Sequence, residues 1–199
     1  MKNLFILFFP LISMAQKEIQ KVEILRSDNQ IEEFTSSLGN SELRVDFLDL
    51  LFFPALTIGY ERTDSSYSGF GSTLFINLGR DDSAGVNWND KFVLIPYYRF
   101  YFLQKKDFGG YGIFVEVFTK FSIGKYEKNF MDQDEMFQTV NYFDIAPGLA
   151  GGRKWINKKG FTFELLFGVG RNLLINSDEE YSGRSVGTFR AGVSVGKRF

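Results

Sequence analysis

From residue 43 to the C-terminus, apolar and polar side chains alternate along the chain, in segments separated by turn-rich stretches. Such alternation is typical of β-strands, because successive side chains of a strand point to opposite faces. The pattern predicts eight strands, which cover residues 42–51, 54–64, 67–79, 91–103, 111–124, 139–155, 160–172 and 187–199. The first strand is the least regular, since Asp49 shares a face with apolar residues.

The two faces of these strands differ in size and charge. In residues 161–170, the odd positions carry three Phe, one Leu and one Val, whereas the even positions carry Thr, Glu, Leu and two Gly. The interior of an eight-stranded barrel is just wide enough for side chains to fill, which suits small residues and a few paired charges. The bulky apolar face therefore points outward, and an apolar exterior requires lipid around it.

We accordingly predict an all-β fold, a closed eight-stranded antiparallel up-and-down transmembrane β-barrel that covers residues 42–199. The even number of strands agrees with what single-chain bacterial outer-membrane barrels require. A soluble lipocalin-like binding barrel also alternates, but its large apolar face points inward. That fold is the less favoured alternative.

Aromatic residues at the strand ends give a second indication of a membrane. On the outward face, strands two to eight each carry one aromatic at the expected periplasmic end, namely Tyr60, Phe70, Phe102, Tyr111, Trp155, Phe161 and Phe199. Aromatic girdles of this kind mark the interfaces of membrane barrels. Phe92 and Phe102 are ten residues apart. At about 3.3 Å per residue and a tilt of about 40–45°, they span roughly 24 Å of membrane.

Charged residues also occur on the inward face. Seven of them are Glu61, Arg99, Glu116, Lys120, Asp144, Glu164 and Arg190, with Lys91 and Arg198 nearer the rims. In a narrow lumen these charges must pair, because an unpaired buried charge costs several kcal/mol. We predict a structural salt-bridge network that fills the barrel. A gated ion path or a proton relay is the functional alternative.

The N-terminus has the three parts of a cleaved signal peptide, residues 1–15. Lys2 supplies the positive charge, residues 4–12 form a short apolar run, and Ser13 and Ala15 precede the expected cleavage site. A membrane-spanning helix needs about 20 apolar residues, roughly twice this run. Residues 16–41 are polar and are expected to form a periplasmic leader, with an extra short strand around residues 19–25 as the alternative.

The connections between the predicted strands alternate in length. Short turns are expected at residues 63–67, 104–110 and 156–160, and longer extracellular loops at 80–90, 125–138 and 173–186. The loops combine acidic residues with exposed aromatics such as Trp88 and Tyr181, a composition suited to binding an extracellular partner. For the composition taken alone, solvated loops without a partner are the simpler interpretation. Acidic sites for divalent cations that bridge lipopolysaccharide are a further alternative.

Composition removes several function classes. The chain has 24 Phe, 9 Tyr and 20 Gly in 199 residues, but no Cys and no His. Without Cys there are no disulfides or thiolate metal sites, and without His the commonest general base is missing. We therefore expect no catalytic residue, no metal and no cofactor. A net charge of -1 gives no reason to expect nucleic acid as a partner.

Three short runs complete the pattern: GYER at residues 59–62, APGLAGGRKW at 146–155 and the terminal GVSVGKRF. With these runs and eight strands, residues 42–199 resemble small outer-membrane barrels of the outer-membrane protein A and X type. Within that group, the chain is most similar to barrels of unknown function from Gram-negative bacteria. The resemblance implies a monomer in the cell outer membrane, in contact with lipid and lipopolysaccharide. It also implies that the assembly machinery reads Phe199, although Lys197 departs from the usual signal.

Together these observations predict a structural or surface-interaction role that acts through the extracellular loops. A narrow ion or small-solute channel is the alternative function.

Overall fold

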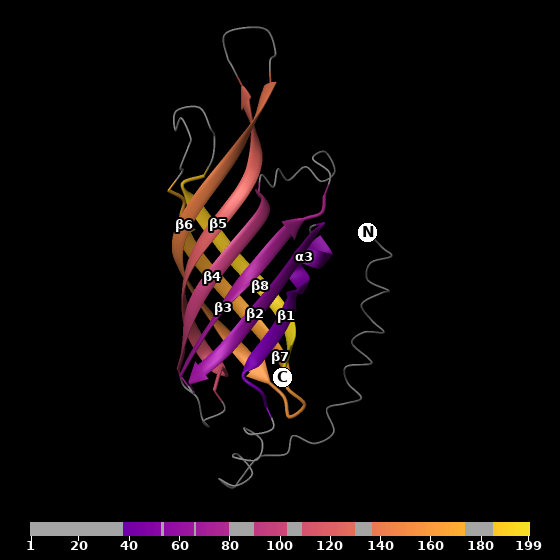
Figure 1. Cartoon of the computed structure of the whole chain (residues 1–199), viewed down its shortest axis with the longest axis vertical. Helices are drawn as coiled ribbons and strands as arrows, with labels where there is room; N and C mark the ends of the chain where they lie inside the picture. Colours follow the sequence, from indigo (N-terminus) through magenta and orange to yellow (C-terminus); the bar gives the residue numbers. More distant parts are fainter. Residues whose placement is uncertain are drawn as a thin grey trace.

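Eight strands form one closed antiparallel β-barrel, in which each strand pairs with its sequence neighbours and β1 pairs with β8 (Figure 1). They are β1 (Ser41–Asp46), β2 (Ala55–Ser65), β3 (Ser68–Asn77), β4 (Asp90–Phe102), β5 (Gly112–Asn129), β6 (Phe137–Ile156), β7 (Phe161–Arg171) and β8 (Gly187–Arg198). This computed structural model describes residues 38–52, 54–65, 67–79, 90–102, 109–129, 137–173 and 185–199. The predicted closed, eight-stranded, up-and-down barrel is confirmed.

The barrel closes where its first and last residues meet. The backbone N–H of Phe199 donates to the carbonyl of Ser41 at 2.8 Å, and that of Ser41 donates to the carbonyl of Phe199 at 3.1 Å. We call this end the terminal end, and the opposite end, where β3–β4, β5–β6 and β7–β8 connect, the loop end. The turn between β6 and β7 lies at the terminal end, where Gly160 adopts a φ of 77°. Glycine tolerates this left-handed conformation without steric cost.

The strands present two different faces, as the alternation predicts. On β4 the even-numbered side chains Phe92, Leu94, Tyr98, Phe100 and Phe102 are 39–49% exposed. The odd-numbered side chains between them are buried, and Arg99 is 0% exposed. Large apolar residues on all eight strands are exposed in the same way. The exterior of the barrel is therefore apolar.

Glycines on the inner face make room for large neighbours. A Cβ on Gly152 would lie 2.5 Å from Cζ of Phe114, and a Cβ on Gly148 would lie 2.3 Å from Cζ of Phe118. Both phenylalanines are buried inside the barrel. The interior therefore contains large aromatic side chains as well as charges, and these two phenylalanines each lie beside a glycine.

The prediction of a strand over residues 42–51 is wrong in its second half. β1 ends at Asp46, and Phe47–Phe52 form a short helix, α3. The carboxylate of Asp46 accepts the backbone N–H of Leu48 at 2.9 Å, which is an N-cap contact that favours helix initiation. The helix places Leu50 outward and Asp49 beside the lumen, where it accepts a hydrogen bond from Thr57. Asp49 therefore does not face outward, as a strand would require.

The loop predicted at 125–138 is also partly wrong. β5 and β6 continue as a two-stranded ribbon to the pair Asn129 and Phe137, and this ribbon projects beyond the other strands (Figure 1). Charged residues on both faces of 125–129 remove the alternation that would have revealed this extension. Residues 80–89, 103–108, 130–136 and 174–184, with the N-terminal 1–37, lie outside the described residues. Within the described ranges no helix is long and apolar enough to cross a membrane.

Candidate functional site

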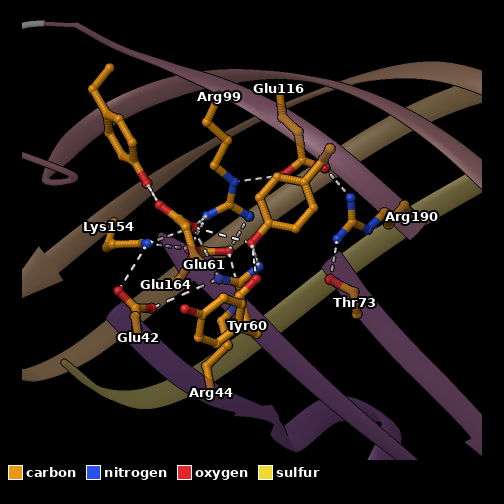
Figure 2. Close-up of polar contacts among 12 residues, drawn as sticks. Glu42, Arg44, Tyr60, Glu61, Thr73, Arg99, Glu116, Lys154, Glu164 and Arg190 are labelled. Carbon is orange, nitrogen blue, oxygen red and sulfur yellow. Dashed lines mark hydrogen bonds and ion pairs between the residues drawn. The ribbon is translucent and has the colours of Figure 1, made fainter. Parts of the chain in front are cut away.

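Arg99 lies at the centre of a buried cluster of charges in the lumen (Figure 2). Its Nε donates to Glu116 at 2.6 Å, and its Nη1 donates to Glu61 at 2.7 Å. Nη1 and Nη2 also bind the two carboxylate oxygens of Glu164, at 2.6 and 2.8 Å. The guanidinium carbon lies 4.2 Å from the ring centroid of Phe114. One cation therefore holds carboxylates from three strands while its face packs on an aromatic ring.

Lys154 and Arg44 also bind Glu61. Lys154 donates from Nζ to Glu42 at 3.1 Å and to Glu61 at 2.9 Å. Arg44 donates to Glu61 at 3.1 Å and to the hydroxyl of Tyr97 at 2.7 Å. Glu61 therefore receives hydrogen bonds from cations on β1, β4 and β6.

Arg190 extends the cluster toward the loop end. Its Nη1 binds the second carboxylate oxygen of Glu116, and its Nη2 donates to Thr73 at 2.9 Å. Figure 2 shows this arginine on the opposite side of Arg99 from Lys154. Thr73 brings β3 into the same network, so every strand of the barrel contributes a side chain.

The ion-pair cluster, as we name it, contains four carboxylates and four cations: Glu42, Arg44, Glu61, Arg99, Glu116, Lys154, Glu164 and Arg190. Its charges balance, and all eight residues are largely buried. Attraction between opposite charges in direct contact offsets much of the free energy that it costs to remove these charges from water. The cluster ties the walls of the barrel together across the lumen.

The structure joins five of the seven sequence-predicted lumen charges in this cluster and leaves two outside it. Lys120 instead pairs with Asp90 at 2.5 Å, nearer the loop end. The hydroxyl of Tyr142 donates to the same Asp90 carboxylate at 2.6 Å. Asp144 is buried on the inner face of β6, opposite Ser122 in the strand register. Arg198 lies at the terminal end, where it donates to the carbonyls of Gly39 and Gly109.

Sequence reasoning missed Glu42, Arg44 and Lys154 as members of the cluster. Lys154 shares the parity of Asp144 on the same strand, so extension of the alternation would have placed it inside. Glu42 and Arg44 lie on the inward parity of β1. Their strand was the least regular in the pattern, so the alternation did not show clearly which of its residues point inward.

The seven residues of the predicted aromatic girdle all lie near the terminal end. Five are exposed, Tyr60, Phe70, Phe102, Phe161 and Phe199, whereas Tyr111 and Trp155 are half-buried. Two exposed basic residues lie against girdle rings. The guanidinium carbon of Arg153 lies 5.0 Å from the ring centroid of Trp155, and Nζ of Lys197 lies 4.5 Å from that of Phe161.

A cavity of about 150 Å³ occupies the lumen between the ion-pair cluster and the loop end, and we call it the lumen cavity. Arg44, Glu164 and Arg190 form its floor. Buried apolar side chains that include Phe75, Ile95 and Phe118 form one wall. Asp46 and Asp49 lie on the wall that α3 helps to form.

Across the part of the chain that the structure describes, no group of three or more Asp, Glu, Cys or His is placed to hold a metal ion. Searches against protein-family models, curated proteins and solved structures found no match to this chain.

Proposed function

We propose that this protein is a non-catalytic, monomeric outer-membrane β-barrel, exported by a cleaved N-terminal signal peptide, that acts through surface interactions at its loop end. The observation that carries the proposal is the apolar exterior. Exposed apolar side chains on every strand, and Phe47, Leu50 and Leu51 on α3, encircle the barrel. Soluble monomers rarely expose a continuous apolar surface of more than a few hundred Å².

The rim of the terminal end supports the same proposal. Arg153 and Lys197 are exposed on the otherwise apolar outer face, each against an aromatic ring. Long basic side chains beside aromatic residues are suited to the interface between acyl chains and headgroups. Phe199, exposed at this rim, fits the proposed role in recognition by the assembly machinery.

The ion-pair cluster weighs against the narrow-channel alternative. Arg99 and Glu116 are both 0% exposed. Arg99 also binds Glu61 on β2, and Glu116 also binds Arg190 on β8, so the ion pairs extend across the lumen. An ion that crosses this layer would have to separate several buried ion pairs, each costly to break. The proposed role is therefore that of a sealed membrane anchor.

Cell fractionation with gel mobility tests the location. We expect the full-length chain in the outer-membrane fraction, with gel mobility that changes on heating. Recovery in the soluble periplasm without heat-dependent mobility would favour the lipocalin-like alternative. In liposomes we expect no ion flux; flux that disappears on Glu116→Gln or Arg190→Gln would instead support the channel.

Epitope insertion tests which end faces outward. A tag inserted within residues 130–136 should be detected on intact cells. The matched control is a tag in the 157–160 turn at the opposite end, which should be detected only after the outer membrane is permeabilised. Deletion of 130–136 that abolishes binding of a surface partner while the barrel still assembles would support the interaction role.

A further inference from the structure

The lumen cavity is a candidate for a binding site that the membrane-anchor role does not use. Its apolar wall combines Phe75, Val93, Ile95, Phe118 and Leu166 from four strands. Apolar cavities of about 150 Å³ admit a ligand the size of benzene. The dimensions and the lining therefore fit a small apolar group, such as one aromatic ring.

The opposite wall carries negative charge that has no matching cation. Asp46 and Asp49 both line the cavity, where the carboxylate of Asp46 interacts with the backbone of Leu48, Asp49 and Val193, and Asp49 accepts a hydrogen bond from the hydroxyl of Thr57. Among the residues that the structure describes, no Lys or Arg lies within ion-pair distance of either carboxylate. These two aspartates therefore leave the cavity with a net negative wall.

The other charges that line the cavity are already paired. Lys120 binds Asp90, Arg190 binds Glu116, and Arg44 and Glu164 belong to the balanced ion-pair cluster. A cationic ligand would thus meet two free negative charges, whereas an anionic ligand would have to displace an existing partner from one of the arginines or Lys120.

The cavity also reaches the wall of the barrel beside α3. β1 pairs with β8 only as far as Asp46 and Ser194, so Gly187–Val193 of β8 pairs with β7 but has no strand partner on its other side, where α3 contacts β8. We call this part of the wall the seam. On β8 the cavity lining includes the outward-facing Phe189 and Ala191 as well as the inward-facing Gly192. The aspartates of α3 and β1 thus lie where the cavity meets the seam.

We infer that the lumen cavity binds a small amine. The ammonium group lies between Asp46 and Asp49 at the seam, and an apolar body of about the size of a benzene ring packs against Ile95 and Phe118. This inference goes beyond the proposed function and does not depend on it, because the cavity and both carboxylates belong to the barrel wall and lumen, whatever surrounds the barrel.

Three probes with the same ring and different charge test the inference: benzylamine, benzyl alcohol and benzoate. Binding is measured by NMR titration of the full chain in lipid nanodiscs. We expect benzylamine to bind more tightly than benzyl alcohol, and benzoate to bind most weakly. Shifts of the Ile95 methyl groups and of Thr57 should saturate together, whereas residues at the terminal end should not shift.

The double variant Asp46→Asn, Asp49→Asn isolates the role of charge, since it keeps the size of both side chains. It should lower the affinity for benzylamine about tenfold or more, the equivalent of one charge-assisted hydrogen bond, and leave benzyl alcohol unchanged. The variant Val93→Phe, which fills the apolar wall, should lower the affinity for both probes. As a control for folding, each variant should show the same heat-dependent gel mobility as the wild type.

Three outcomes would overturn the inference. One is the absence of saturable shifts at Ile95 with millimolar benzylamine. Another is tighter binding of benzoate than of benzylamine. The third is an unchanged preference for benzylamine in the folded double variant, which would place the ammonium group elsewhere. Because none of these results changes membrane fractionation, failure of this inference is distinguishable from failure of the proposed function.

Discussion

The guanidinium of Arg99 on β4 and the carboxylate of Glu164 on β7 form two parallel hydrogen bonds across the lumen, at 2.6 and 2.8 Å. β4 and β7 are not neighbours in the barrel, so no backbone hydrogen bonds join them. The pair therefore links two parts of the wall that the sheet itself does not connect. Its forked geometry is one that arginine provides and lysine does not.

Replacement of Arg99 by methionine should therefore destabilise the barrel strongly. The variant keeps an unbranched side chain but leaves Glu61, Glu116 and Glu164 without their shared cation. We expect the free energy of unfolding in lipid vesicles to fall by about 3–5 kcal/mol. Arg171→Met, at the exposed end of β7, is the matched control and should change it by no more than about 0.5 kcal/mol. Equal losses in the two variants would show that the cluster has no special role in stability.

Adjacent glycines on β6 provide a test of lumen packing. A Cβ at Gly152 would lie 2.3 Å from the carbonyl oxygen of Leu165, whereas the nearest atom to a Cβ at Gly151 is 3.7 Å away. Gly152→Ala should cost about 1–3 kcal/mol through overpacking. Gly151→Ala should be nearly neutral. Urea unfolding of both variants measures the difference, and a loss of stability at Gly151 alone would contradict the assigned faces.

A charge on the outer face distinguishes a lipid exterior from a watery one. Val117 lies on the outer face of β5, 49% exposed and paired with Tyr98 and Leu149. In a bilayer, Val117→Arg should cost about 2–4 kcal/mol. The same change at Leu173, beyond the end of β7, should cost about 0–1 kcal/mol. If Val117→Arg leaves the free energy of unfolding unchanged in vesicles, the exterior does not contact acyl chains.

The cap of α3 predicts a difference between two substitutions of Asp46. Asp46→Ala removes the acceptor for the N–H of Leu48 and should cost about 0.5–2 kcal/mol. Asp46→Asn should be close to wild type, because asparagine caps helices about as well as aspartate. The free energy of unfolding of both variants checks this, and equal stability of the two would mean that the cap contributes little.

The strands and their faces were predictable because the outward-facing residues are mostly apolar, whereas the buried charges lie on the lumen-facing side. In β4, β5 and β7 most residues on the outward face are large and apolar, and one slip in register would reverse the faces. The helix α3 was not predictable in this way. The run Phe47–Phe52 is apolar at both strand and helix spacing, and its helical character depends on the cap that Asp46 supplies.

The ion-pair cluster was only partly predictable, for a related reason. The alternation of residues shows whether a side chain points into the barrel. It does not show at which height along the barrel axis the charged end of that side chain lies. Lys120 and Arg190 both point inward, yet one pairs with Asp90 near the loop end and the other binds Glu116. The lumen cavity depends on α3 and on packed side chains of several strands, so the alternation contains no sign of it.

β1 is the strand with the weakest attachment in the barrel. Five residue pairs join it to β2 and five to β8, whereas every other junction in the described barrel has nine or more. The β1–β8 junction also unites the two ends of the barrel sequence, so its formation requires the longest loop closure. We therefore expect the strands to associate as a curved open sheet before this junction forms. Local unfolding on heating should begin at the same junction. β1, the strand that closes the barrel, should therefore also be the first to detach from it.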